Sequence, residues 1–383
     1  MANALNDIIP TLYEASYRNS REIIGMIPAV MRDPRTARAA IGQTIDVPIP
    51  QVGEARNIAP GHINPNAGDA TIPTVQVTMQ KARAIDVRWN GEEERAVGFT
   101  GTFNPILAGQ LQEAMRKLSN EIEADLIALA KASASRVTGT AGTAPLGTAG
   151  DLSPLADLAR ILDENGAPLN DRQFVASSAT MANARGKQTI LLKTNEAGSD
   201  DMLRNGMTDR VSGFAWRYSP QIGLHVSGTG TGYLVNSAAG LAVGDRAIPV
   251  DTGTGTIIAG DVVSFAADSA NRYVAATALS AGVFRIHRPG IRTAIPDDNA
   301  VTVGASDTPT FGFDRSALLL AMRPPAVPDG GDSADDAYVL TDDYSGIPFE
   351  IRVYREYRQR RIEVALAWGV NALNTAHIAM LLG

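Results

Sequence analysis

The feature that most constrains the fold is one long stretch of helical periodicity, residues 104–136. Asn104 is a favourable N-cap residue, and Pro105 then takes the first helical position, where its missing N–H is not needed. About 30 residues make a rod of roughly 45 Å. Apolar side chains recur at steps of four and three, the spacing of one helix face; they are Leu107, Leu111, Met115, Leu118, Ile122, Leu126 and Leu129.

The other face of this helix is predicted to be exposed, because it carries polar side chains: Glu113, Arg116, Lys117, Asn120, Glu121 and Glu123. A coiled-coil or bundle helix is one alternative. The apolar stripe lasts only about three heptads, however, and the chain offers no second helix of similar length. We therefore expect a single long helix laid across a sheet.

Composition sets limits on the function. The 383 residues allow two or three domains and a sizeable core. The absence of cysteine excludes disulfides, thiolate chemistry and cysteine zinc sites. A net charge of −7 argues against nucleic-acid binding by the charge of the whole chain. No secretory signal and no run of about 18 apolar residues is visible, so we expect a soluble protein folded in a cytoplasm, without a membrane partner.

The first 92 residues are predicted to form extensions rather than a core. Residues 1–40 alternate short apolar groups with prolines and glycine, which is typical of an arm lying on another surface. Gln43–Pro50 alternates like a strand, and Ile72–Val87 alternates again after a polar, turn-rich segment. Together they predict a long hairpin with a polar tip, a kind of loop that is usually functional.

The rest of the chain mixes helices and strands. We expect helices over 151–165 and 178–192, and strands over 174–178 and 214–220. Between Thr229 and Gly304, short β runs separated by evenly spaced turns predict a small β-barrel inserted into a surrounding domain. Its runs are 233–235, 247–250, 262–265, 272–276, 283–287 and 300–303.

The last part is predicted as a strand or short helix within 311–328, an acidic turn at 329–336 and two alternating strands within 347–366. A short amphipathic segment over 368–382 closes the chain.

No catalytic or metal-binding motif emerges from the sequence. The four histidines, His62, His225, His287 and His377, lie far apart, and none has a metal-ligand spacing. The segments GTGTG at 228–232 and GTGT at 253–256 lack the lysine and helix of a phosphate loop, so turns are expected. Pairs of aspartates match no calcium loop. We predict no enzyme activity, no cofactor and no metal.

One basic segment, residues 351–361, interleaves arginines with Tyr354 and Tyr357. This pattern could bind single-stranded nucleic acid, or it could pair with carboxylates across an interface. The acidity of the chain favours the interface. The candidate contacts between subunits are Arg56, Lys81, Arg83, Arg88, Glu92, Glu93, Glu94, Arg352, Arg355, Arg358, Arg360 and Arg361. Several predicted elements bury little on their own, as expected of a lattice subunit completed by its neighbours.

Three segments carry a resemblance to a known family: AMRKLSNEIEADL (114–126), FDRSALLLAMRPP (313–325) and AWGVNA (367–372). In this order they resemble the major capsid proteins of tailed bacteriophages, whose fold is named after phage HK-ninety-seven. The similarity is greatest to the coat-protein family of the short-tailed phage P-twenty-two, which carries an insertion domain.

The resemblance implies an α+β chain with this division: N-terminal arm 1–40, extended loop 41–92, peripheral domain with spine helix 93–160, axial domain 161–226, inserted β-barrel 227–305, axial domain 306–335, peripheral β-hairpin 336–366 and a C-terminal axial segment 367–383.

It also implies a function. The subunit would form hexamers and pentamers that close an icosahedral head around double-stranded DNA, in a virion assembled in the host cytoplasm. Scaffolding and portal proteins would be partners during assembly, and a decoration protein could bind outside. An encapsulin-like cellular compartment is the alternative within the fold. A secreted β-rich adhesin or sugar-binding protein is the alternative outside it, disfavoured by the missing signal, the sparse aromatics and the long helix.

Overall fold

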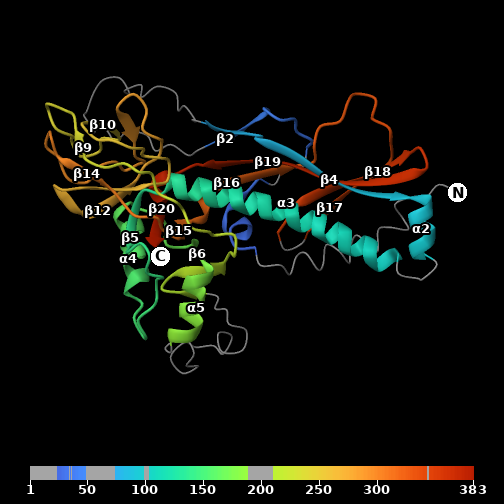
Figure 1. Cartoon of the computed structure of the whole chain (residues 1–383), viewed down its shortest axis with the longest axis horizontal. Helices are drawn as coiled ribbons and strands as arrows, with labels where there is room; N and C mark the ends of the chain where they lie inside the picture. The colour runs from blue at the N-terminus through green and yellow to red at the C-terminus, as the bar shows by residue number, and fades with distance from the viewer. Residues whose placement is uncertain are drawn as a thin grey trace, which may run out of the picture.

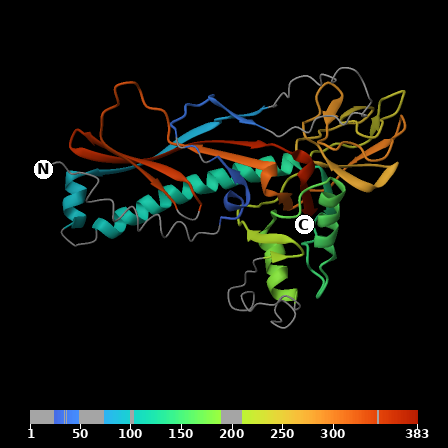
Figure 2. The ribbon, with the colours of Figure 1, turned by 180° about the vertical axis from the view of Figure 1, so that it is seen from behind.

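A computed structural model describes residues 24–33, 35, 37–48, 74–98, 103–188, 210–342 and 345–383. These residues form a mixed α/β structure with few helices and many strands, as Figure 1 shows. One helix runs along most of the elongated molecule. At one end of it lie the strands β9 to β14, with the helices α4 and α5 projecting to the other side, an arrangement also clear from behind in Figure 2.

The long helix is α3, Phe103–Ser133, which confirms the predicted helix. The predicted apolar stripe is buried from Leu107 to Leu126, and Leu129 packs against the same core. The predicted end at Arg136 was three residues too late. Ser135 donates its backbone N–H to the Ile378 carbonyl, and Arg136 begins strand β5 (Arg136–Gly139) beside the C-terminal strand.

The apolar face of α3 packs on a six-stranded sheet. Five strands follow the order β1 (Met31–Arg32), β16 (Leu318–Arg323), β19 (Gln359–Ala372), β18 (Pro348–Glu356) and β17 (Ala334–Thr341), and β4 (Lys81–Asn90) also pairs with β19. All pairs are antiparallel except β1 with β16. The two strands predicted within 347–366 are β18 and β19, whereas β17 was missed because the acidic turn was expected to extend through it.

A two-stranded ribbon lies on the opposite face of this sheet. It pairs β2 (Thr44–Pro48) with β3 (Thr74–Thr78), in register Thr44 with Thr78 and Pro48 with Thr74. Its base packs through Ile45, Val77 and Met79 against β16 and β19. The ribbon can approach closely because residue 369 is glycine: a Cβ there would lie 2.2 Å from the Thr78 carbonyl oxygen. The predicted polar tip, residues 49–73, lies outside the described residues.

The single strand predicted over Ile72–Val87 was wrong. It is two strands in different sheets, β3 in the ribbon and β4 in the six-stranded sheet. The break falls at Met79 and Gln80, where Met79 is fully buried and the Gln80 N–H is donated to the Trp368 carbonyl. A short helix, α2 (Gly91–Gly98), follows β4.

The second sheet contains twelve strands. Its first half joins β5, β20 (Ile378–Leu382), β15 (Thr310–Asp314), β6 (Arg172–Ala176), β8 (Phe214–Tyr218) and β7 (Arg210–Val211). Helices α4 (Ser153–Glu164) and α5 (Ser178–Lys187) pack on it around Phe174 and Phe214. Residues 189–192 of the predicted second helix are outside the described residues.

Two predictions about the later segments need correction. The region predicted as one strand or a short helix is strand β15, the 3-10 turn η3 (Arg315–Ala317) and strand β16. The amphipathic close is the end of β19, the 3-10 turn η4 (Thr375–His377) and the fully buried β20. A third such turn, η2 (Ile27–Ala29), precedes β1. Strands lying between two packed layers are apolar on both faces, so their sequences lack the alternation expected of a strand.

The second half of the twelve-stranded sheet contains β9 (Tyr233–Val235), β10 (Ala247–Asp251), β11 (Val262–Phe265), β12 (Asp268–Val274), β13 (Val283–Arg285) and β14 (Ala300–Val303). Each predicted run is therefore a strand. They pair in the order β13, β10, β9, β14, β11, β12 around their own core, which includes Phe265, Tyr273 and Phe284. β12 then continues into the first half by pairing with β5.

Gly369→Ala should loosen the ribbon, because the new methyl group meets the Thr78 backbone rather than a flexible side chain. We expect the free energy of unfolding to fall by about 1–3 kcal/mol, as for overpacking in a core, measured by chemical denaturation. Gly223→Ala is the matched control, since nothing lies within 4 Å of a Cβ there. Equal stability of the two variants would contradict this account of Gly369.

Candidate functional site

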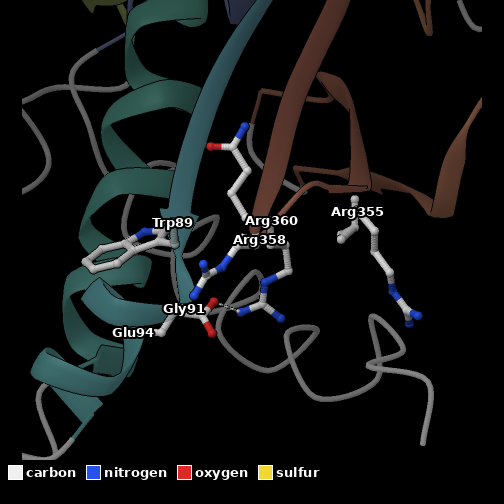
Figure 3. A pocket seen from close by; sticks show the side chains of 8 residues that line it. Trp89, Gly91, Glu94, Arg355, Arg358 and Arg360 are labelled. Atoms are coloured by element: carbon white, nitrogen blue, oxygen red, sulfur yellow. Dashed lines mark hydrogen bonds and ion pairs between the residues drawn. The ribbon is translucent and has the colours of Figure 1, made fainter.

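The predicted basic segment lies at one end of the six-stranded sheet, which we call the hairpin end. It consists of the β18–β19 turn (Tyr357 and Arg358), the last residues of β4 and the start of α2. A pocket of about 450 Å³ opens there between Trp89, Glu94, Arg358 and Arg360. Figure 3 shows Arg358, Arg360 and Glu94 gathered beside Trp89, while the side chain of Arg355 points away from them.

Most arginines of this segment pair with carboxylates of the same chain. Arg360 lies 2.9 Å from Glu94, and Arg355 lies 2.8 Å from Asp335. Arg361 lies 3.2 Å from Glu356 and stacks over the Tyr354 ring at 4.5 Å. The sequence predicted pairing with carboxylates across an interface, whereas the carboxylates seen here belong to the same chain. Contact with a neighbouring subunit stays a prediction.

Arg352 is the most buried member of the set, with 8% of its side chain exposed. It donates to Glu350 at 2.9 Å and pairs with Asp332, and Arg38 reaches the same Glu350 oxygen at 2.6 Å. Burial opposes the charged form of Arg352. Hydrogen bonds to Glu350 and Tyr354 and the charges of Glu350 and Asp332 outweigh it and raise the pKa above its usual range. This network ties residue 38 to β18.

The predicted residues of β4 also have partners nearby. Lys81 lies 2.7 Å from Asp125 on α3, Arg83 lies 3.6 Å from Glu121, and Arg88 lies 3.1 Å from Asp86. Arg83 and Arg88 remain more than half exposed. Arg56 lies outside the described residues.

The acidic triplet 92–94 begins α2. Asn90 accepts the backbone N–H groups of Glu92 and Glu93, and the Glu93 carboxylate accepts the Asn90 N–H in return. This reciprocal arrangement is a capping box. Acidic side chains in the first turn also stabilise the helix, because they lie near the positive end of its dipole. Glu92 and Glu93 are exposed, while Glu94 is occupied by Arg360.

The tip of the hairpin end is the most exposed part of the predicted segment. Tyr357 is 90% exposed, and Arg358 holds a positive φ of 56° in the turn. No ion pair joins Arg358 to any other residue in the described ranges. A large aromatic side chain and a guanidinium at a two-residue turn are suited to contact another surface.

Glu123 is a correction to the predicted exposed face of α3. Its side chain is completely buried and accepts the backbone N–H groups of Met26 at 2.9 Å and Ile27 at 3.2 Å, together with the Ser219 hydroxyl at 3.1 Å. Burial raises the pKa of Glu123 above its ordinary value, although these hydrogen bonds act in the opposite direction. Glu123 thus anchors residues 24–30 to the middle of α3.

A second buried charge cluster joins α3 to the strands β9 to β14, and it was not predicted from the sequence. Lys131 lies 3.1 Å from Asp307, and His225 lies 3.0 Å from Asp261. The backbones of His225 and Asp307 also bond to each other. Burial lowers the pKa of Lys131 and raises that of Asp307. Lys131 and Asp307 are 176 residues apart in the chain, so no local sequence pattern could indicate that they pair.

The two glycine–threonine segments pack against each other rather than around a ligand. Thr231 and Thr254 form a backbone bridge, and a Cβ at Gly228 would lie 2.3 Å from the Thr256 carbonyl oxygen. Turns were the prediction at both places. Across the described ranges, no group of three or more histidine or acidic side chains is arranged to hold a metal ion. None of the described helices has both the length and the apolar character needed to cross a membrane.

No family model and no curated protein matches this sequence. Among solved structures, the chain is similar to one from Mycobacterium phage Che8, with 11% identity, a TM-score of 0.43 and coverage of 90% of this chain and 88% of that one. The capsid structure of the cyanophage P-SCSP1u shares 10% identity with a TM-score of 0.45, and the match covers 92% of this chain and 86% of that one. A virus-like particle from Pyrococcus furiosus shares 11% identity with a TM-score of 0.44, and the match covers 98% of this chain and 99% of that one.

Arg352→Ala should lower the free energy of unfolding by about 3 kcal/mol, because it removes a partner from the buried carboxylate Glu350. Arg355→Ala removes a guanidinium that is 54% exposed, so its effect should stay below about 1 kcal/mol. Denaturant titration of both variants measures the difference. Equal effects would mean that burial does not distinguish the two arginines.

Glu123→Gln tests the buried carboxyl group through its pH dependence. Because the folded-state pKa is raised, Glu123 stabilises the fold most below its unfolded value of about 4.5, and this contribution is lost as the pH rises through the folded value. The unfolding free energy of the wild type should therefore fall relative to that of Glu123→Gln as the pH rises from about 4.5 towards neutrality. Glu113→Gln, at an exposed position of the same helix, should run parallel to the wild type. A constant gap between wild type and Glu123→Gln would refute the raised pKa.

Proposed function

We propose that this chain is the structural subunit of a closed protein shell, with the fold of the tailed-phage capsid proteins named after HK-ninety-seven. The observation that carries the proposal is the meeting of three segments that resemble this family in sequence. They are separated by up to about 240 residues in the chain, from residue 126 to residue 367, and each contributes to the same core.

Residues 114–126 form the central part of α3, residues 313–325 span the end of β15, η3 and β16, and residues 367–372 form the end of β19. β16 and β19 pair directly, with Leu320 opposite Val370. The Trp368 indole N–H donates to Asp125 on α3 at 2.9 Å. Segments that resemble one family and also contact one another are more than three unrelated short matches.

The finer proposal concerns the strands β9 to β14. We infer that they form the inserted barrel of the P-twenty-two-like coat proteins, over about residues 227–305. Their pairing order, from β13 at one end to β12 at the other, supports this inference. A backbone bridge between Ala275, just after β12, and Ile286, just after β13, supports it too, because it joins these two end strands to each other. The remaining parts would then be the arm, the extended loop, and the peripheral and axial domains at the boundaries expected from the sequence.

The proposed partners are copies of this chain, arranged as hexamers and pentamers in an icosahedral head around double-stranded DNA and assembled in the host cytoplasm. A scaffolding protein, a portal and a decoration protein belong to the same proposal. Of the candidate contact residues, the exposed ones are best placed to reach a neighbour: Arg83, Arg88, Glu92, Glu93, Arg355 and Arg358. A shell of this kind needs no catalytic site.

The full chain, expressed alone and together with the neighbouring reading frames of its source genome, should form uniform closed round particles. Negative-stain microscopy and sedimentation measure this directly. A requirement for a neighbouring gene would identify a scaffold, and an enzyme copurifying inside the particles would favour an encapsulin-like compartment over a phage head. A monomer or small oligomer in both preparations, at high protein concentration, would refute the shell.

A further inference from the structure

The six-stranded sheet has two long outer edges. In the order β17, β18, β19, β4, the strand β17 pairs only with β18, and β4 pairs only with β19 over this part of the sheet. Within the described ranges, no strand pairs with the outer side of either. β17 is 8 residues long and β4 is 10, so each edge offers a row of backbone donors and acceptors. Edges of this length normally pair or are protected.

The directions of the four strands allow one edge to extend the other. All three pairings are antiparallel, so β17 and β4 run in opposite directions. A second copy placed in the same orientation would bring its β17 beside β4 of the first copy. The added pair would also be antiparallel, and the alternation would continue from one sheet into the next.

The charges of the two edges are opposite. β4 carries three basic side chains and one acidic one, Lys81, Arg83, Arg88 and Asp86, which gives +2. β17 carries Asp335 and Asp336 and no basic side chain, which gives −2. Pairing of β4 with β4, or of β17 with β17, would place like charges opposite each other, which is destabilising. Only the mixed pairing brings opposite charges together.

A groove follows the outer side of β4. It lies between this strand and α3, has a volume of about 290 Å³, and is lined by Ile85, Val87 and Ala114, with Glu113 and Lys117 on its α3 side. It leaves space for side chains of a strand added to β4. On β17, Val339 is 41% exposed, an apolar side chain that an added neighbour would cover.

We propose that β17 of one copy adds to the β4 edge of the next, so that neighbouring six-stranded sheets join through complementary edges. The inference rests on the proposed function, since it supplies a contact for self-assembly. The contact is heterologous, with different surfaces on the two partners. Such contacts produce rings where the rotation between copies closes. The occupant of the β4 edge is therefore a second copy of this chain.

Charge reversal on each edge tests the proposal in the full chain. Asp335→Lys/Asp336→Lys makes both edges basic, and Arg83→Glu/Arg88→Glu makes both acidic. Each double variant should reduce the fraction of protein in particles at least about tenfold, because its two edges repel. Combining all four substitutions in one chain restores opposite edges and should restore particles. Thermal melts followed by circular dichroism verify that each variant is folded.

Arg246→Glu/Arg285→Glu is the matched control for Arg83→Glu/Arg88→Glu, because it makes the same charge change at two exposed positions, Arg246 just before β10 and Arg285 at the end of β13. It should assemble like the wild type. Normal assembly of either edge variant, failure of the folded fourfold variant, or equal loss in the control would each overturn the edge pairing while leaving the shell proposal in place. Failure of the wild type to form particles would instead refute the shell on which the inference rests.

Discussion

The packing of one helix face on one sheet is the constraint on which the rest of this structure depends. The buried stripe of α3 meets Phe349, Ile351, Val364, Leu366 and Trp368 from the six-stranded sheet in a single core. Burying large side chains of this kind contributes roughly 1.5–3 kcal/mol each. The same core takes in Met26 and Ile27 at one side and Phe311 and Met380 at the other. The helix therefore shares one core with side chains of both sheets and of the N-terminal segment.

Buried charged side chains fix the path of the N-terminal segment across this apolar core. The segment 24–40 is held at successive points by Glu123, by Arg323 with Asp33, and by Arg38 with Glu350. A buried pair contributes little net stability compared with apolar side chains, but breaking one is costly. A segment fastened in this way has one favourable path across the sheet, because any shift along it would leave several buried charges without partners.

Local patterns in the sequence were sufficient for elements whose stability is local. The helix α3 was predicted because its periodicity, its start and its lack of interruptions agree, and the strands β9 to β14 were predicted because turns separate them evenly. The prediction was wrong where distant parts of the chain decide the outcome. The break between β3 and β4 exists because Trp368 and Gly369 meet it from the other end of the sequence. Glu123 is buried because residues 25–27 supply its donors, which no helical pattern can reveal. At the candidate site, the arginines were predicted to pair with carboxylates across an interface, whereas Asp335, Glu94 and Glu350 of the same chain could be identified as partners only from the fold.

The pairing of β12 with β5 has a mechanical consequence. The strands β9 to β14 follow β8 and precede β15, so the chain itself connects them to the rest of the molecule at two places. The β12–β5 ladder adds a third attachment, and Arg136 at its centre bonds Asn271 on β12 as well as Asn165 and Glu164 at the end of α4. A hydrogen bond of 3.0 Å between His225, which follows β8, and Asp261, which precedes β11, makes a fourth attachment. A force applied to the outer turns between the strands β9 to β14 would then be transmitted through several attachments to α3, and these strands would move together with the helix as one rigid unit.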